Sequence, residues 1–366
     1  MSAEETRQER LLAVLAERGL GALLVTEQSN VRYLTGYVGS NGIALIGVGG
    51  RMLLTDSRYA VSARDQVRGA EVVIGSRDLL ADVAAALPDV ADGGRIGVEA
   101  DSLTLTRHAR LVERLGGVAP EPTGGIVETL REVKDAAEVD AIRRAAAVVD
   151  RALARVLEQG LVGRSEREVA FALHGAVLEE GGEGLSFDTI VAAGPRGARP
   201  HAVPGGEPIP PDTLVVIDMG AVVDGYCSDM TRTVATGPLP PKLEEIYEVC
   251  LRAQEAAVAA ARAGVGAAEL DGVARAVITE AGFGDAFGHG LGHGVGMAIH
   301  ERPGVRPESD ATLATGMAVT IEPGIYLEGV GGVRIEDLVI ITDEGCEVLS
   351  RTPKELRTVG RGSGAE

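Results

Sequence analysis

The chain has 366 residues, 45% hydrophobic and 24% charged, so two globular domains are expected and disorder is not indicated. A formal net charge of −19, without clustered Lys and Arg, repels phosphate backbones and argues against nucleic acid as a partner. Three widely spaced cysteines, no signal-like segment and no long uncharged apolar run predict a cytoplasmic protein with neither a disulfide framework nor a membrane association.

The first third of the chain alternates short apolar runs with helical periodicity. Leu11, Leu12 and Leu15 recur at helical spacing within residues 6–18, and a buried strand is expected at 22–25. Further strands are expected at 43–48, 52–55, 72–74 and 96–98, and helices at 58–67, 78–87 and 105–115. This alternation predicts an α/β domain over residues 1–122, and a Gly- and Pro-rich stretch predicts a linker at 123–127.

Residues 128–358 form the second predicted domain. Helices are expected at 135–159, 165–180, 241–263 and 267–281, with strand and hairpin signals over 189–236 and 290–349. Helices and strands that occur in separate runs favour the α+β class. The glycine-rich residues 359–366 are expected to form a disordered tail.

An apolar strand over residues 214–220 carries Asp218, and the pair Asp224 and Gly225 downstream predicts a two-residue hairpin turn. Such a turn sets Gly220 opposite Asp229, so Asp218 and Asp229 become diagonal neighbours about 5–8 Å apart on one face. Like charges this close are costly unless a cation neutralises them. For these two acids alone, a solvated sheet face is an equally good interpretation.

A second pair of acids strengthens the metal interpretation. Glu322 ends the apolar run 317–321, and Glu336 follows the glycine-rich stretch 329–332. A three-residue loop at 329–331 would set Gly324 opposite Glu336 and again make the two acids diagonal neighbours on one face. The sequence therefore predicts four carboxylates in two facing pairs.

Four of the six histidines lie in glycine-rich or proline-flanked stretches of the second domain: His201, His289, His293 and His300. Glycines surround His289 and His293, which lets the backbone approach a ligand closely. No Lys-Ser/Thr pair follows these glycines, which excludes a phosphate-binding P-loop. Taken alone, the stretch is also typical of a flexible turn.

Four carboxylates and one imidazole suit a pair of divalent ions, Mn²⁺, Co²⁺ or Zn²⁺, held about 3.5–4 Å apart. The predicted ligands are Asp218, Asp229, His293, Glu322 and Glu336. A hydroxide shared by two such ions is a nucleophile at neutral pH, and the ions also polarise a carbonyl group. The pattern therefore predicts a hydrolase with two metal ions.

The five ligands stand in the motifs I-D-M-G, S-D-M-T-R-T, H-G-L-G-H-G-V-G, I-E-P-G-I-Y and V-R-I-E-D. Their order resembles the proline-specific metallopeptidases of the pita-bread fold, the aminopeptidase P and prolidase (Xaa-Pro dipeptidase) group. Residues 30–36, 55–59 and 130–138 also look like this family's first domain and the entry to its catalytic domain. The resemblance implies a pita-bread catalytic domain preceded by a smaller α/β domain of the creatinase type.

The resemblance also implies a role for each metal ligand. Asp229 and Glu336 would contact both ions, and His293 and Glu322 would complete the shell of one ion. Manganese is the metal expected, with cobalt or zinc as alternatives. Glu322 would also carry a proton from the attacking water to the leaving proline nitrogen, so it is a predicted catalytic residue as well as a ligand.

Three further imidazoles and one arginine receive roles by the same resemblance. His201 and His300 would stabilise the tetrahedral intermediate, and His201 would also contact the substrate. His289 would line the proline pocket. Arg334 is predicted to belong to the substrate-binding residues and would hold the ligating carboxylates in place on the side away from the metal ions. The substrates implied are proline-containing peptides or dipeptides, and a homodimer or larger homo-oligomer is expected.

The resemblance leaves the substrate open between Xaa-Pro dipeptides and longer peptides. Some prolidases place an arginine where this chain has Gly304, to hold the carboxylate of a dipeptide, and here Arg302 and Arg306 flank that position. One alternative is an enzyme like methionine aminopeptidase, which normally lacks such a first domain. The other is a non-catalytic peptide-binding member of the fold, whose mark would be lost ligands.

Overall fold

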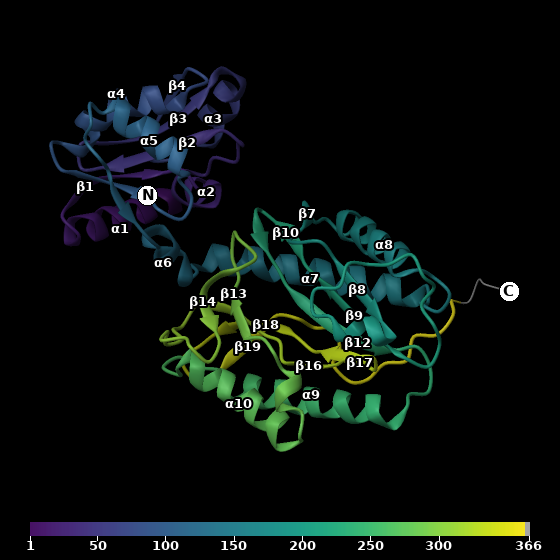
Figure 1. The fold of residues 1–366 in the computed structure, drawn as a ribbon. Coiled ribbons are helices and arrows are strands. Elements are labelled where there is room, and N and C mark those ends of the chain that lie inside the picture. Colours follow the sequence, from purple (N-terminus) through teal and green to yellow (C-terminus); the bar gives the residue numbers. More distant parts are fainter. Residues whose placement is uncertain (363–366) are drawn as a thin grey trace. The chain divides into compact units, whose positions relative to one another are not determined.

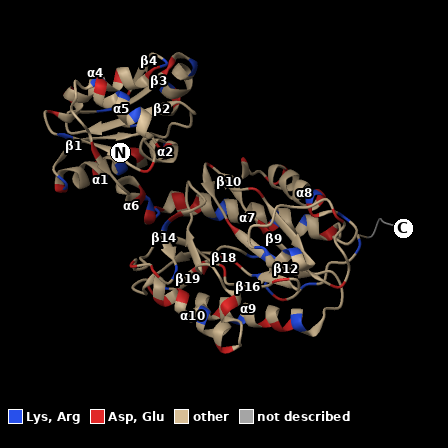
Figure 2. Ribbon diagram, viewed as in Figure 1, with Lys and Arg blue, Asp and Glu red and all other residues tan. Residues whose placement is uncertain are grey.

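The computed structural model describes residues 1–362 and divides the chain into two compact units, Met1–Arg131 and Glu132–Glu366 (Figure 1). Acidic residues outnumber basic ones, 54 to 35, and Figure 2 shows both kinds scattered along the helices and loops of each unit. Within residues 1–362, no helix is long and apolar enough to cross a membrane.

The first unit is built on one mixed sheet with the strand order β4-β3-β2-β1-β5-β6. Its strands are β1 Leu20–Val25, β2 Gly42–Gly47, β3 Gly50–Asp56, β4 Glu71–Gly75, β5 Arg95–Glu99 and β6 Glu121–Thr123. Its helices are α1 Ala3–Glu17, α2 Gln28–Thr35, η1 Ser57–Tyr59, α3 Ala60–Gln66, α4 Leu79–Ala91, α5 Leu105–Arg114 and α6 Ile126–Glu132. The α/β alternation predicted from the sequence is confirmed, except that the helices α2 and α6 were not foreseen.

The boundary between the units lies later than the expected linker at 123–127. Thr123 pairs with Glu99 in the first sheet, and α6 begins only three residues further on. The hydroxyl of Tyr33 donates to the carbonyl oxygen of Leu130 at 3.0 Å, and Arg131 donates to the side chain of Asn30 at 2.6 Å. These bonds attach α6 to the first unit, so the unit extends to Arg131 rather than ending at residue 122.

The second unit contains four long helices: α7 Ala136–Glu158, α8 Glu166–Glu179, α9 Pro241–Ala260 and α10 Ala267–Glu280. All four were predicted with ends that differ by at most three residues. Capping boxes begin two of them, because Asp135 and Ser165 accept hydrogen bonds from the first helical turn of α7 and α8. The helices α7 and α8 pack in one hydrophobic cluster, and α9 and α10 pack in another.

The strands of the second unit form several small sheets between these helix pairs (Figure 1). One side holds β7 Gly184–Leu185, β8 Ile190–Ala193, β9 Leu214–Met219, β10 Ala221–Val223, β11 Tyr226–Cys227 and β12 Met230–Ala235, with the short helix η2 Gly194–Ala198 between β8 and β9. The other holds β13 Gly292–Gly294, β14 Glu301–Val305, β15 Ala318–Ile321, β16 Gly324–Leu327, β17 Gly331–Arg334, β18 Asp337–Ile341 and β19 Cys346–Val348, after η3 Gly284–Ala286. The α+β class expected for this unit is confirmed.

The tail expected at 359–366 does not begin at residue 359. The amide of Val359 donates to the carbonyl oxygen of Ala235 at 2.7 Å, and Gly160 pairs with Arg361. Val359 is also buried in the cluster around α7 and α8. The expectation is therefore wrong for residues 359–362, and residues 363–366 lie outside the described part of the chain.

The first predicted hairpin has the expected register. Asp224 and Gly225 form its turn with φ values of 50° and 76°, and Val223 pairs with Tyr226. The strands β9 and β12 continue in the same register, with Asp218 opposite Thr231. Gly220 therefore faces Asp229, and the two acids are diagonal neighbours as the turn chemistry predicted.

The second hairpin differs from its prediction. Gly324 pairs with Arg334 and Leu327 pairs with Gly331, so the three-residue loop is 328–330 rather than 329–331. The predicted register is wrong by two residues. The neighbouring pair of β15 and β18 keeps the observed register, with Ile321 opposite Asp337. Continued between the two ladders, this register sets Glu322 opposite Glu336, which brings the acids closer than a diagonal arrangement would.

Replacing Gly220 with alanine tests the first hairpin. A Cβ atom at this position would lie 2.1 Å from the carbonyl oxygen of Ser228 and 2.7 Å from Oγ of Ser186. We expect Gly220→Ala to lower the stability toward urea by about 1–3 kcal/mol, because the strands must separate. The control is Gly184→Ala in β7, where nothing lies within 4 Å of the added atom. Equal stability of the two variants would contradict the close approach.

Candidate metal centre and cleft

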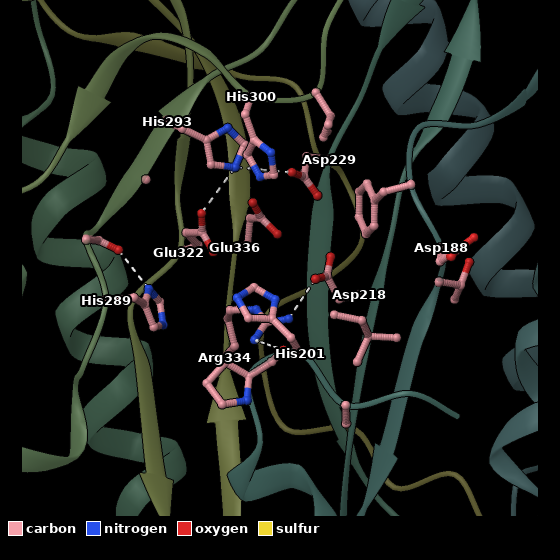
Figure 3. Close-up of a pocket in the computed structure, with 18 of the residues that line it drawn as sticks. Asp188, His201, Asp218, Asp229, His289, His293, His300, Glu322, Arg334 and Glu336 are labelled. Carbon is pink, nitrogen blue, oxygen red and sulfur yellow. Dashed lines mark hydrogen bonds and ion pairs between the residues drawn. The ribbon is translucent and has the colours of Figure 1, made fainter. Parts of the chain in front are cut away.

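The five predicted ligands come together at a cleft of about 820 Å³ in the second unit (Figure 3). Each comes from the end or the interruption of a strand. Asp218 lies in β9, Asp229 precedes β12, His293 lies in β13, Glu322 follows β15, and Glu336 lies between β17 and β18. Strand ends leave these side chains free to project into the cleft rather than into a packed sheet interface.

The ligand atoms lie within reach of shared cations. Nε2 of His293 is 3.4 Å from Oε1 of Glu322 and 3.6 Å from Oδ2 of Asp229. Ligand atoms of Asp229, His293 and Glu336 all lie within 4.8 Å of one another. Figure 3 shows Asp218 on the same wall of the cleft, next to Arg334. The arrangement brings together all five residues that the sequence singled out.

Two carboxylate oxygens in this cluster are buried without a hydrogen-bond partner among the described residues. They are Oδ1 of Asp218 and Oε1 of Glu336. A buried oxygen without a partner costs about 1–3 kcal/mol, and more when it carries charge. The other oxygen of each group accepts a hydrogen bond, from Arg334 at 2.6 Å and from Thr231 at 2.8 Å. The oxygens without a partner are therefore available to ligate a cation.

The pKa values of the clustered side chains in the absence of a cation also indicate a metal site. Burial, followed by repulsion from neighbouring carboxylates, raises the pKa values of Asp229 and Glu336 well above their ordinary range. Burial also raises the pKa of Glu322 to about 7, and it lowers the pKa of His293 to about 4. Divalent cations would offset the repulsion among the acids, and the neutral imidazole is already in its ligating form.

Arg334 is buried, and its guanidinium donates hydrogen bonds to other groups of the protein. It donates to Asp218 at 2.6 Å, to the hydroxyl of Tyr326 at 3.0 Å and to the carbonyl oxygen of Pro200 at 3.2 Å. Its Nε also donates to Thr231 at 3.0 Å. These bonds fix the orientation of Asp218, a predicted ligand, and of Tyr326 and Pro200 beside it. Sequence reasoning missed Tyr326, although it lies four residues after Glu322 in the same motif.

Behind Glu336, a buried polar network includes the next residue along the strand. The carboxylate of Asp337 accepts from Arg232, Lys354 and Gln254 at 2.8 to 2.9 Å. Arg232 also donates to the carbonyl oxygen of Glu336. The network joins the strand of Glu336 to α9 and to the C-terminal segment. No local sequence pattern predicts it, because its members are far apart in the chain.

Three further histidines predicted to act at the site, His201, His289 and His300, line the same cleft. The ring of His300 lies against that of His293, with centroids 4.4 Å apart. His289 packs between Phe287 and Tyr326, and its Nε2 is 2.9 Å from the Tyr326 hydroxyl. Burial lowers the pKa of His289 to about 4, so this ring is neutral and forms a largely apolar wall.

His201 lies on an exposed loop whose two ends are fixed by Glu166, at the start of α8. The buried Glu166 carboxylate accepts from the backbone amides of Ala193 at 2.8 Å and Gly205 at 2.6 Å. It also pairs with Arg196, inside the loop, at 2.9 Å. From the sequence, Glu166 looks like an ordinary residue of a helix N-terminus, so this clamp was not foreseen.

Comparison with known proteins identifies the family. The model described as Metallopeptidase family M24 matches residues 140–343, and that of the Creatinase/Prolidase N-terminal domain matches residues 7–133. The structure of an Xaa-Pro dipeptidase from Bacillus anthracis has a TM-score of 0.94 and 40% identity, covering 97% of this chain and 99% of that one. The structure of an X-Pro aminopeptidase from Thermotoga maritima has a TM-score of 0.88 and 36% identity, covering 96% of this chain and 100% of that one. The Xaa-Pro dipeptidase of Pyrococcus furiosus is 35% identical over 96% of this chain and 99% of its own.

Fold and site together define a metallopeptidase. The chain belongs to metallopeptidase family M24, because that family's model covers more than half of it and its relatives match over nearly their full length. Its second unit has the pita-bread fold and its first unit is the creatinase-type domain, as the motifs implied.

The raised pKa values predict how pH affects the metal-free protein. Because Glu322 has a pKa of about 7 in the fold against an ordinary 4.5, the native state binds more protons than the unfolded state between these values. The stability that Glu322 contributes should therefore fall as pH rises through this window, and saturating Mn²⁺ should reverse this loss. The lowered pKa values of His289 and His293 act in the opposite sense below about pH 6.5, so the contribution of Glu322 is measured against a variant. Thermal unfolding between about pH 5 and about pH 8 measures this. Metal-free Glu322→Gln should lose less stability than metal-free wild type over this range, and an equal pH dependence of the two proteins would contradict the raised pKa of Glu322.

Glu166→Gln tests the clamp on the loop of His201. Without its charge, the side chain loses the ion pair with Arg196, so the loop should position His201 less well. We expect kcat/KM for peptide hydrolysis to fall about tenfold at saturating metal. Metal content, measured by elemental analysis, should not change. The control is Glu179→Gln on the same helix, which removes an exposed pair with Arg155. Equal rates for the two variants would rule out the positioning role.

Proposed function

We propose that the protein hydrolyses the bond between any residue and a following proline, at the N-terminus of peptides or in Xaa-Pro dipeptides, with two divalent metal ions. One observation carries the metal part of the proposal. Four carboxylates and an imidazole converge on one cleft, and two of the carboxylate oxygens are buried without a partner among the described residues. The proline requirement is supported by the similarity to two Xaa-Pro dipeptidases and an X-Pro aminopeptidase.

The donor set fits the proposed ions. Carboxylate oxygens with one imidazole suit manganese, and cobalt or zinc are the alternatives. In this proposal Asp218, Asp229, His293, Glu322 and Glu336 would hold the pair, and Asp229 and Glu336 would be the carboxylates that the two ions share. Such ions, when bound, lower the pKa of a water molecule and polarise the scissile carbonyl.

Glu322 is the residue proposed to move a proton. Its carboxylate lies 3.4 Å from Nε2 of His293 and accepts a hydrogen bond from the Thr320 hydroxyl at 3.2 Å. This bond leaves Glu322 a second oxygen toward the cleft. It would accept a proton from the attacking water and deliver it to the proline nitrogen as the peptide bond breaks.

The imidazoles are proposed to act on the substrate. His300 and His201 would donate to the oxygen that gains negative charge in the tetrahedral intermediate, where preorganised donors lower the barrier most. The neutral ring of His289, packed against Phe287 and Tyr326, would form one wall of the pocket for the proline ring. Arg334 would hold Asp218 and the cleft wall in place rather than bind the substrate directly.

Family resemblance is also the support for two properties of the whole protein. We propose that it assembles as a homodimer or larger homo-oligomer and that it acts in the cytoplasm. Its substrates would then be peptides or dipeptides from the breakdown of proteins in that compartment.

Removal and return of metal test the proposed function. Protein stripped with a chelator should not cleave Ala-Pro, and Mn²⁺ or Co²⁺ should restore cleavage with two ions bound per chain. Ala-Ala should remain intact throughout, which checks the proline requirement. Asp229→Ala should not regain activity under the same treatment, because it lacks a shared ligand. Full activity of a preparation shown to be metal-free by elemental analysis would overturn the mechanism.

A further inference from the structure

His300 has no hydrogen bond to hold its side chain in place. It is exposed, and its imidazole makes no hydrogen bond or ion pair with another residue among 1–362. Its ring lies edge-on to that of His293, with the centroids 4.4 Å apart (Figure 3). His300 is the last residue of the loop 295–300, which joins β13 to β14. The place of this imidazole in the cleft is therefore set by the backbone of that loop.

The loop 295–300 is folded around one carboxylate, that of Glu301 at the start of β14. Oε1 of Glu301 accepts from the backbone amide of Ala298 at 2.9 Å. A Cβ atom at Gly296 would lie 2.5 and 2.6 Å from the two carboxylate oxygens, so the backbone of the loop passes directly against this group. The carbonyl oxygen of Gly296 accepts from the amide of Cys227 at 2.7 Å, which attaches the loop to β11. The conformation of the loop thus depends on where the Glu301 carboxylate is held.

Lys134 holds that carboxylate from a distant part of the chain. Its Nζ is 3.4 Å from Oε2 of Glu301, and the two side chains are 1% and 6% exposed. Nζ also donates to the carbonyl oxygen of Glu132 at 3.3 Å, and the backbone amide of Lys134 donates to the carbonyl oxygen of Gly316 at 3.0 Å. The lysine is therefore fixed at its backbone and at its tip. A buried ion pair adds little net stability, since desolvation offsets the attraction, but it fixes the direction of both groups.

We propose that Lys134 is a positioning residue of the enzyme: through Glu301 it holds the loop 295–300 in the conformation that presents His300 to the cleft. This inference rests on the proposed function, since it assumes that His300 acts on the intermediate formed at the metal centre. Lys134 itself is not among the described residues that line the cleft. The ligand His293 is held separately, because its backbone amide donates to the Thr320 hydroxyl at 3.0 Å. Loss of the ion pair should therefore displace His300 and leave the metal site intact.

The kinetics of the manganese-loaded enzyme on Ala-Pro test the proposal. Lys134→Met should lower kcat about 10- to 100-fold with little change in KM, because a donor to the oxyanion acts in the transition state. Its metal content should equal that of wild type. In a His300→Ala background the same substitution should lower kcat by less than about threefold, because the group that it positions is already absent. The control is Lys242→Met, which removes an exposed pair with Glu245 on α9 and should leave kcat unchanged.

A neutral double variant keeps the test independent of folding. Lys134→Met alone leaves the Glu301 carboxylate buried without its cation, which destabilises the fold. Lys134→Met combined with Glu301→Gln removes both charges and keeps an acceptor for the Ala298 amide. We expect this variant to unfold at the temperature of wild type and to lose kcat about tenfold. A wild-type kcat in the double variant, or a loss from Lys134→Met that is as large without His300 as with it, would overturn the role of Lys134. A wild type that does not cleave Ala-Pro would instead overturn the proposed function.

Discussion

The structure of the second unit depends on the burial of four carboxylates and an imidazole around one small space. Without a cation, burial and mutual repulsion raise the pKa values of Asp229, Glu322 and Glu336, and two carboxylate oxygens of the cluster have no partner among the described residues. Such an arrangement persists only where the surrounding fold supplies the free energy to hold it. The two helix pairs and their hydrophobic clusters supply that free energy. A bound cation would relieve the repulsion among the buried acids, so part of the free energy spent on burying them would favour metal binding.

Polar groups on the side away from the cleft fix the positions of the buried acids. Arg334 holds Asp218 from one side, and the network around Asp337 holds the strand of Glu336 from the other. Asp218 and the strand of Glu336 therefore have fixed partners on the side away from the cleft, which is the kind of support that metal ligands generally have. The loop of His201 follows the same rule, since Glu166 fixes both of its ends. Proton transfer and oxyanion stabilisation depend on such fixed positions, because small displacements of catalytic groups cost large factors in rate.

The two hairpins of the site show how far local sequence can be trusted. Asp224 and Gly225 favour positive φ at both turn positions, so this turn has one good solution and the register around Asp218 followed correctly. The loop before Glu336 has several glycines and thus several acceptable turns. The register of β16 with β17 agrees with that of the neighbouring pair, β15 with β18. The loop sequence alone contains no information about this second pair of strands. The helix α2 was missed for a similar reason, because eight residues of modest propensity fold there around the buried side chain of Asn30.

The sequence by itself determined the long helices, the α/β character of the first unit, and which five residues would cluster at the cleft. These features follow from periodicity, capping residues and motifs, all of which act over a few neighbouring residues. Only the tertiary structure decided where the first unit ends, that residues 359–362 are paired, and which groups support the ligands. Such contacts join segments far apart in the chain, so they depend on packing that no local pattern encodes.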